Sequence, residues 1–179
     1  MITSETNKQI FNFVTPVKIL IVVSPYYKDI SDNLISGARN ECNKFDTDVH
    51  IVEVPGALEI PSAIRIAFRK SNYDGFIALG CVVRGETSHY ETVCCDSSRG
   101  LMLLGIHGAN IGNGILTVEN MAQAEERADP KKLNKGGGAA IAMLSLIHFE
   151  RTIIKKNPDV GFKSSNFRVD GAELDKGIS

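Results

Sequence analysis

Short apolar runs alternate along the chain with segments whose apolar residues recur at helical spacing. Residues 17–23 (VKILIVV) form a continuous run rich in β-branched residues, which is typical of a strand buried on both faces. Similar runs predict strands at residues 48–54, 73–81 and 110–117, the last of them interrupted by glycines. The pattern therefore predicts four strands.

Five helices are predicted between and after these strands. From Ile30 to Cys42 the apolar residues recur every four positions, which predicts an amphipathic helix. A second helix with a broad apolar face covers residues 60–68, and Pro61 lies in its first turn, where its missing N–H costs nothing. The other helices are expected from 89 to about 105, from a cap at Asn120 to about 129, and from 139 to about 155, after three consecutive glycines.

The alternation of strands and helices predicts the fold class. Strand and helix alternate four times, which indicates an α/β fold with a central four-stranded parallel sheet, right-handed crossovers and helices on both faces. Ligands of such sheets bind outside the carboxyl ends of the strands. The loops that follow the four strands should therefore meet at one edge, and they are residues 24–26, 55–59, 81–89 and 113–119.

The length of the chain suits one domain with a substantial core, since it has 179 residues. We divide it into an N-terminal arm (1–15), which we expect to be loose, a single domain (16–156) and a C-terminal tail (157–179). The tail is polar and rich in Gly, Ser and Asp, and its apolar residues follow no period, so we expect it to be flexible.

Composition excludes several classes of function. The net charge is −1 and no block of lysines or arginines occurs, so a broad nucleic-acid-binding surface is not expected. The apolar runs are too short to span a membrane, and we see no signal peptide. The four cysteines have neither zinc-site spacing nor the pattern of a disulfide framework. We therefore expect a cytoplasmic protein with reduced thiols.

The stretch 80–91 (GCVVRGETSHYE) combines a strand end, a glycine turn and a helix start. Ser88 and Glu91 fit the capping-box pattern that marks a helix N-terminus. His89 falls in the first turn of that helix, and the ordinary histidine pKa of ~6.5 suits proton transfer. The backbone amides of residues 86–87 could hold a phosphate at the positive end of the helix. Turn and cap roles without chemistry fit these residues about equally well.

Four further residues are candidates for binding. Glu59, in the first turn of a helix, could accept hydrogen bonds from a polyhydroxylated ligand, and Tyr26 could stack on a planar heterocycle. The planar fork of Arg127 matches a phosphate, and Lys135 precedes the three glycines. Taken one at a time, each also fits an ordinary surface or helix-end residue. No P-loop or dinucleotide-binding glycine motif is present.

Four separated segments, taken together, resemble one family. They are 55–61 (PGALEIP), 80–90 (GCVVRGETSHY), 114–120 (GILTVEN), and 126–128 (ERA) followed by 134–136 (NKG). Their order and spacing across residues 17–154 are similar to those of lumazine synthase, 6,7-dimethyl-8-ribityllumazine synthase. The resemblance implies a flavodoxin-like three-layer sandwich and a homopentamer with active sites between subunits. It also implies that the reaction needs no metal and no organic cofactor.

The same resemblance implies a reaction and a set of site residues. The reaction condenses 5-amino-6-(D-ribitylamino)uracil with 3,4-dihydroxy-2-butanone 4-phosphate, releasing phosphate and water, in the penultimate step of riboflavin synthesis. The residues that match the uracil site are Tyr26, Ala57, Leu58, Glu59, Cys81, Val82, Val83 and Asn113. Those that match the phosphate site are Glu86, Thr87 and Arg127, with His89 as the general acid/base and Lys135 in a supporting position.

The resemblance has two departures and leaves alternatives open. Many members of the family have phenylalanine at the position of Asn113, and phenylalanine or tryptophan at that of Tyr26. One alternative is a protein that binds flavin or lumazine without catalysis. A second is an enzyme of the same fold that makes riboflavin from two lumazines, and a third is a generic flavodoxin-like phosphate-binding domain.

Overall fold

Four parallel strands form one sheet in the computed structural model, which describes residues 11–156. The strands are β1 (Val17–Val23), β2 (Thr47–Glu53), β3 (Gly75–Val83) and β4 (Ile111–Val118). Their order across the sheet is β2-β1-β3-β4, and every pairing is parallel. The four predicted strands and their parallel arrangement are confirmed.

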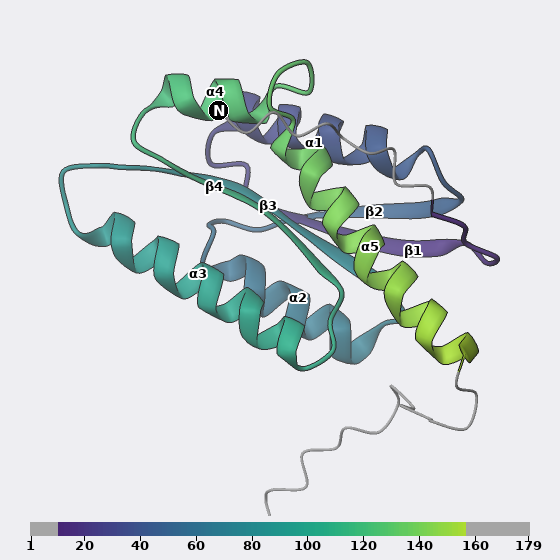
Figure 1. Cartoon of the computed structure of the whole chain (residues 1–179). Coiled ribbons are helices and arrows are strands. Elements are labelled where there is room, and N and C mark those ends of the chain that lie inside the picture. Colours follow the sequence, from purple (N-terminus) through teal and green to yellow (C-terminus); the bar gives the residue numbers. More distant parts are fainter. Residues whose placement is uncertain (1–10, 157–179) are drawn as a thin grey trace, which may run out of the picture.

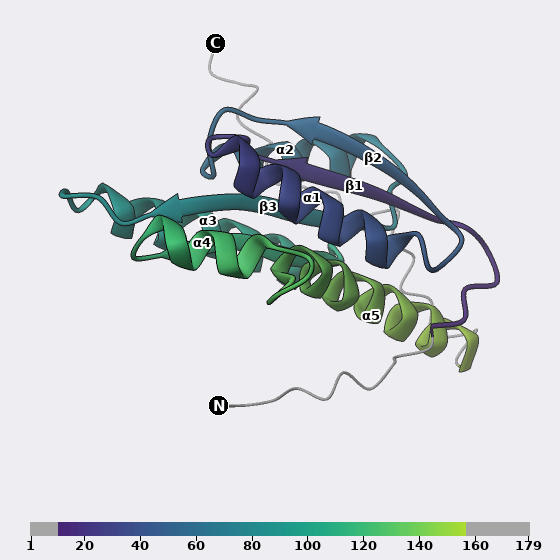
Figure 2. The ribbon, with the colours of Figure 1, turned by 90° about the horizontal axis from the view of Figure 1, so that it is seen from above.

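Helices cover both faces of the sheet and give three layers. One face carries α1 (Lys28–Cys42), α4 (Met121–Ala128) and α5 (Lys135–Lys156), and the other carries α2 (Glu59–Lys70) and α3 (His89–Ile106) (Figures 1 and 2). The predicted three-layer α/β fold is therefore confirmed. None of the helices described within residues 11–156 has an apolar stretch long enough to cross a bilayer.

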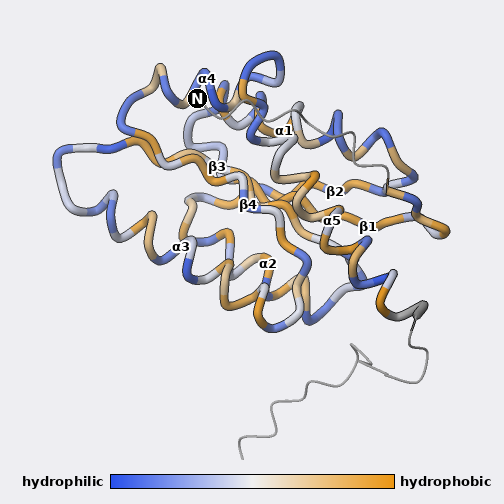
Figure 3. Tube along the Cα trace, viewed as in Figure 1, coloured by the Kyte–Doolittle hydropathy of each residue, from blue (hydrophilic) through white to orange (hydrophobic). Residues whose placement is uncertain are grey.

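The residues of β1 explain why its sequence is continuously apolar after Lys18. Ile19 and Ile21 point into the cluster that packs under α1 and α5, whereas Leu20 and Val22 point into the cluster under α2 and α3. A strand covered on both faces has no solvent side, so alternation of apolar and polar residues disappears. The apolar colour of Figure 3 accordingly follows the central strands between the two helical layers.

The glycines of β4 leave room for α5. A Cβ atom on Gly112 would lie 2.0 Å from the backbone oxygen of Ala139, and one on Gly114 would lie 3.1 Å from the Ala139 side chain. Because α5 lies this close to the strand, glycine is required at Gly112. The glycines that interrupt the fourth apolar run are thus packing residues of a buried strand.

The last helix begins earlier than the sequence predicted. The three glycines were expected to precede it, but α5 begins at Lys135 and includes them. A Cβ atom on Gly136 would lie 2.1 Å from the backbone oxygen of Leu34, so this turn of α5 lies directly against α1. Asn134, at a positive φ of 43°, precedes the helix and accepts a hydrogen bond from the N–H of Gly137. Tertiary contact thus outweighs the poor helix propensity of glycine.

The described part of the N-terminal arm packs on the domain. Phe11 is buried in the core, and its ring lies 5.3 Å from that of Phe45 between centroids. Arg151 donates a hydrogen bond of 2.9 Å to the backbone oxygen of Thr15. The expectation of a loose arm is therefore wrong for residues 11–15. The predicted flexible tail, 157–179, lies outside the described residues.

The contact between α5 and α1 yields a matched pair of substitutions. Gly136→Ala should destabilise the protein by about 1–3 kcal/mol, because the added methyl group meets the backbone of Leu34. Gly138→Ala is the control, since nothing lies within 4 Å of its Cβ position, and it should stabilise the helix by about 0.5–1 kcal/mol. Thermal unfolding followed by circular dichroism measures both. Equal melting temperatures for the two variants would contradict the close packing.

Candidate active site

A cavity of about 420 Å³ lies at the carboxyl edge of the sheet. The loops after β1 and β3 and the first turns of α2 and α3 enclose it. The residues that line it are Ser24, Tyr26, Tyr27, Gly56, Ala57, Leu58, Glu59, Cys81, Val82, Val83, Gly85, Thr87, His89, Tyr90 and Val93. This is the edge at which the sequence placed the ligand, and the cavity is large enough for a bicyclic heterocycle.

Most of the predicted site residues come together in this cavity. Nine of them line it: Tyr26, Ala57, Leu58, Glu59, Cys81, Val82, Val83, Thr87 and His89. They come from three loops that are more than twenty residues apart in the chain, so the parallel topology alone brings them together. The residues predicted to meet the uracil and to transfer protons, Asn113 excepted, therefore share one surface.

Four predicted residues lie outside the cavity. Glu86 is an exposed residue of the loop between β3 and α3. Asn113 is exposed on β4, where its side-chain oxygen accepts a hydrogen bond from the N–H of Ile115. Arg127 donates to the backbone oxygen of Gln123 within α4, and Lys135 is exposed at the start of α5. The last three lie on three other elements: Asn113 on β4, Arg127 on α4 and Lys135 at the start of α5.

The end of β3 presents its backbone to the cavity. β1 ends at Val23, which pairs with Leu79, so residues 80–83 extend beyond it and pair only with β4. Within the described sheet, the opposite edge of Cys81–Val83 therefore faces the cavity instead of another strand. A strand edge of this kind offers backbone N–H and C=O groups to a planar ring. This geometry is what backbone recognition of a pyrimidine requires.

Glu59 owes its position to the glycine before it. A Cβ atom on Gly56 would lie 2.7 Å from the Glu59 carboxylate oxygen Oε2, so this carboxylate folds back over the glycine. The backbone N–H of Glu59 also donates to the oxygen of Gly56. The loop thus holds a hydrogen-bond acceptor at the cavity wall, in the first turn of α2, where a negative charge is favourable.

Hydrogen bonds fix the loop after β1. The hydroxyl of Ser31 donates to the backbone oxygen of Ser24 at 3.0 Å, and Ser24 donates to the oxygen of Pro55 at 3.4 Å. Tyr26 is 74% exposed, and its ring meets that of Tyr27 edge-on with centroids 5.0 Å apart. Burial raises the pKa of Tyr27, so its hydroxyl stays protonated at neutral pH. One face of the cavity is therefore aromatic.

The capping box predicted at the start of α3 is not formed. Ser88 occupies the N-cap position with helical backbone angles and makes no capping hydrogen bond through its side chain. Glu91 instead bonds to the guanidinium group of Arg84. The contact with Arg84 pairs two full charges, whereas a capping box would pair the carboxylate with a neutral amide, which accounts for the difference. His89 still lies in the first turn of α3, with its side chain exposed at the cavity.

Arg84 is a residue whose contacts sequence reasoning missed. Its Nε donates to Glu119 at 2.7 Å, its Nη1 bonds to Glu91, and its guanidinium carbon lies 4.1 Å from the centroid of the Tyr90 ring. No spacing rule connects positions 84 and 119. The strand register does, since Val83 pairs with Val118 and the next residues on each strand are neighbours.

Cys81 lines the cavity but is not a nucleophile at neutral pH. Burial raises the pKa of its thiol to about 11, so the reactive thiolate is scarce. All four cysteines of the chain are free. Within the described residues, no three His, Cys, Asp or Glu side chains come together in a group that could hold a metal ion.

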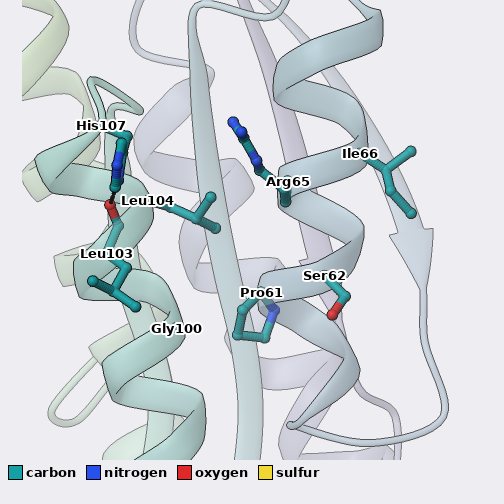
Figure 4. A pocket seen from close by; sticks show the side chains of 8 residues that line it. All are labelled: Pro61, Ser62, Arg65, Ile66, Gly100, Leu103, Leu104 and His107. Atoms are coloured by element: carbon teal, nitrogen blue, oxygen red, sulfur yellow. Dashed lines mark hydrogen bonds between the residues drawn. The ribbon is translucent and has the colours of Figure 1, made fainter. Parts of the chain in front are cut away.

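A second hollow, of about 510 Å³, lies between α2 and α3 (Figure 4). It includes no residue from the loops at the carboxyl edge. Its lining is largely apolar, and Pro61 on α2 and Leu104 on α3 point into the space between the two helices. The ring of His107 is bonded through Nδ1 to the backbone oxygen of Leu103 at 2.7 Å. The groups suited to chemistry are therefore in the cavity at the sheet edge.

The fold and the cavity together define an α/β protein with a ligand-sized cavity at the carboxyl edge of a parallel sheet. Comparison with known proteins narrows this class. Residues 16–151 match the family model of 6,7-dimethyl-8-ribityllumazine synthase. The chain belongs to this family, whose enzymes act in riboflavin biosynthesis.

Curated proteins with the same name are similar over most of the chain. The 6,7-dimethyl-8-ribityllumazine synthase of Jannaschia sp. (strain CCS1) is 52% identical over 152 residues, which cover 85% of each chain. That of Novosphingobium aromaticivorans is 51% identical over 130 residues, 73% of this chain and 94% of the relative. That of Zymomonas mobilis is 47% identical over 136 residues, which cover 76% of this chain and 98% of the relative. These matches favour a synthase over the three alternatives.

The raised pKa of Cys81 gives a test of its environment. Alkylation by iodoacetamide requires the thiolate, so with a pKa of about 11 the rate at Cys81 should rise roughly 30-fold from pH 8 to pH 9.5. Peptide mass spectrometry measures modification site by site. Cys42, fully buried under α1, is the control and should resist the reagent at both pH values. A Cys81 rate that levels off below pH 9 would contradict the assignment.

Proposed function

We propose that the chain condenses 5-amino-6-(D-ribitylamino)uracil with 3,4-dihydroxy-2-butanone 4-phosphate to form 6,7-dimethyl-8-ribityllumazine, releasing phosphate and water. One observation carries the proposal. Tyr26, Glu59 and His89, from three different loops, line one cavity at the carboxyl edge of the sheet. Family membership supplies the identity of the reaction.

The uracil substrate is proposed to bind between the aromatic wall and the end of β3. The exposed ring of Tyr26 stacks on the pyrimidine, and the free backbone edge of Cys81–Val83 bonds to its polar atoms. The ribityl chain then extends along Ala57 and Leu58 toward the Glu59 carboxylate. A carboxylate accepts hydrogen bonds from several hydroxyl groups, so this site favours a polyol.

His89 is proposed to transfer protons during the reaction. The substrate amine attacks the ketone, and the resulting carbinolamine loses water to give an imine. Phosphate is then eliminated, and the ribitylamino nitrogen closes the ring on the remaining carbonyl with loss of a second water. Each of these steps moves a proton at or next to a reacting atom, and the exposed imidazole of His89 lies at the cavity to carry it. Because both substrates share one cavity, their effective concentration rises sharply, and the demand for further catalytic groups is small.

The phosphate is proposed to bind near the start of α3. Thr87 lines the cavity there, and together with Glu86 it offers backbone N–H groups at the positive end of the helix. The planar guanidinium of Arg127 is suited to the phosphate and to its departure. Lys135 supplies additional positive charge. Arg127, Lys135 and Asn113 lie outside this cavity.

We therefore propose a homopentamer in which each site is completed by the neighbouring subunit. Asn113, Arg127 and Lys135 of one subunit would then complete the cavity of the next. The chain exposes large apolar side chains on the side that carries α2 and α3, as an interface requires. They are Ile66, Met102, Leu103 and Ile106, between 51% and 73% exposed, and two of them border the hollow of Figure 4.

A cytoplasmic location is part of this proposal. All four cysteines are free, including the adjacent Cys94 and Cys95. Free thiols persist in a reducing compartment, whereas secreted proteins tend to oxidise theirs. The proposed substrates, a ribitylamino-substituted pyrimidine and a phosphorylated ketone, are also expected in the cytoplasm.

Single substitutions should separate binding from proton transfer. His89→Ala should lower kcat by about 10²-fold or less with little change in KM, because it removes a proton carrier and leaves the pocket intact. Arg127→Ala should mainly raise KM for the butanone phosphate. Steady-state formation of lumazine, followed by absorbance and corrected for the spontaneous rate, measures both. Full activity of His89→Ala would contradict the acid/base role.

Mixed oligomers test whether the site lies between subunits. When His89→Ala and Arg127→Ala subunits are co-expressed, some interfaces receive His89 from one subunit and Arg127 from its neighbour. Assayed at a butanone phosphate concentration far below the KM of the Arg127→Ala variant, random mixing should restore activity to about a quarter of the wild-type level, because about a quarter of the interfaces are then intact. If both groups acted within one subunit, no site would be complete and no activity would return.

A further inference from the structure

Three charged side chains and one aromatic ring meet at the carboxyl edge of the sheet, outside the residues assigned above. They are Arg84, Tyr90, Glu91 and Glu119, which we call the Arg84 bracket. Arg84 follows β3, Tyr90 and Glu91 lie in the first turn of α3, and Glu119 follows β4. One arginine thus connects the ends of two strands with the start of a helix.

The bracket touches the proton-transfer side of the site directly. The Arg84 guanidinium lies over the ring of Tyr90, the residue next to His89, and bonds to Glu91 one position further on. Tyr90 is itself part of the cavity wall. The bond to Arg84 lowers the pKa of Glu91, as expected for a carboxylate that stays ionised beside a guanidinium. Arg84 therefore fixes the turn of α3 that presents His89.

The bracket also connects to the helix that carries Arg127. Arg84 bonds to Glu119 at 2.7 Å, and the N–H of Glu119 donates to the side-chain oxygen of Gln123 at 3.0 Å. The backbone oxygen of Gln123 accepts a hydrogen bond of 3.3 Å from Arg127. Gln123 also donates through its own N–H to the side chain of Asn120, the cap of α4. A continuous set of contacts thus runs from Arg84 to Arg127.

We propose that Arg84 is a positioning residue that sets the placement of His89 in one active site and of Arg127 in the adjoining one. The inference rests on the proposed function, in which His89 and Arg127 of one subunit serve two different sites. Arg84 touches no substrate in this account and acts only through its partners. Loss of Arg84 should therefore impair two neighbouring sites at once, each in a different kinetic parameter.

Exposed ion pairs usually contribute little to stability, and the side chain of Arg84 is 40% exposed. Arg84 differs from an ordinary surface pair because it has three partners on two elements. Two of them lie with His89 in the first turn of α3, and the third is next to the cap of α4. A guanidinium can bond to two carboxylates through separate nitrogens while stacking on a ring, which an ammonium group cannot do. The identity of the arginine therefore matters to the geometry.

The mixed oligomers described above separate the two effects. In a mixture of His89→Ala and Arg127→Ala subunits, every complete site takes His89 from the second kind of subunit and Arg127 from the first. Adding Arg84→Ala to the Arg127→Ala subunit should lower kcat by about tenfold, because only the support of His89 is lost. Adding it to the His89→Ala subunit should instead raise KM for the butanone phosphate by about tenfold.

Other substitutions separate the contact of Arg84 with Glu91 from its contact with Glu119. Glu91→Gln should reproduce the change in kcat alone, and Glu119→Gln the change in KM alone, so the inference is testable even if Arg84→Ala fails to assemble. Arg84→Lys should behave like Arg84→Ala, because the lysine cannot reproduce the fork. The control is Lys44→Ala, which breaks an exposed pair with Glu41 at the opposite edge of the sheet, and it should change neither parameter.

Several results would overturn the inference. A lower melting temperature with unchanged kcat and KM would make Arg84 a purely structural residue, and an effect on only one parameter in the mixed oligomers would remove the link between sites. Full rescue by Arg84→Lys would show that charge alone suffices. Failure of the unsubstituted protein to form lumazine would overturn the proposed function and this inference together. If the mixture of His89→Ala and Arg127→Ala subunits is active and the addition of Arg84→Ala changes neither kcat nor KM, this inference alone is overturned.

Discussion

The register of β3 against its two neighbours is the constraint on which the site depends. β1 stops opposite Leu79, and the remaining residues of β3 continue beside β4 alone. This overhang creates a cavity wall on one edge of β3 and, on the other, places Arg84 next to Glu119. A slip of one residue would turn every side chain of β3 to the opposite face, so the core itself holds the site in alignment.

Close approach of the helical layer to the sheet makes that register rigid. Gly112 and Gly136 let α5 lie against the backbones of β4 and α1, at distances where any side chain would collide. Interiors packed this tightly transmit strain instead of absorbing it. Arg127 and Lys135 are therefore held by the same packed helices and strands as the cavity, although they are proposed to complete the cavity of a neighbouring subunit.

Much of the fold could be predicted from sequence because its signals are local. The run at 17–23 and the four-residue spacing in α1 each identify one element, and the topology then follows from the alternation of strands and helices. The predicted start of α5 was wrong because the low helix propensity of glycine is a local property, whereas the contact of Gly136 with Leu34 depends on tertiary packing. The capping box predicted from Ser88 and Glu91 was wrong for the same reason. Glu91 bonds to Arg84, which lies beyond the helix start, and Arg84 also bonds to Glu119 at the end of the neighbouring strand.

The glycine contact of α5 has a consequence for how this protein is recognised by its sequence. The segment Asn134–Gly136 was among those that resembled the family, yet Asn134 caps α5 and Gly136 gives α1 its room. A descendant chain that lost His89 and all activity would still carry this signature, because its folding would require it. With His89 in its proposed role, the part of the signature that distinguishes a working enzyme from an inactive descendant is the start of α3, where the chain gains nothing in packing from a histidine exposed at the cavity.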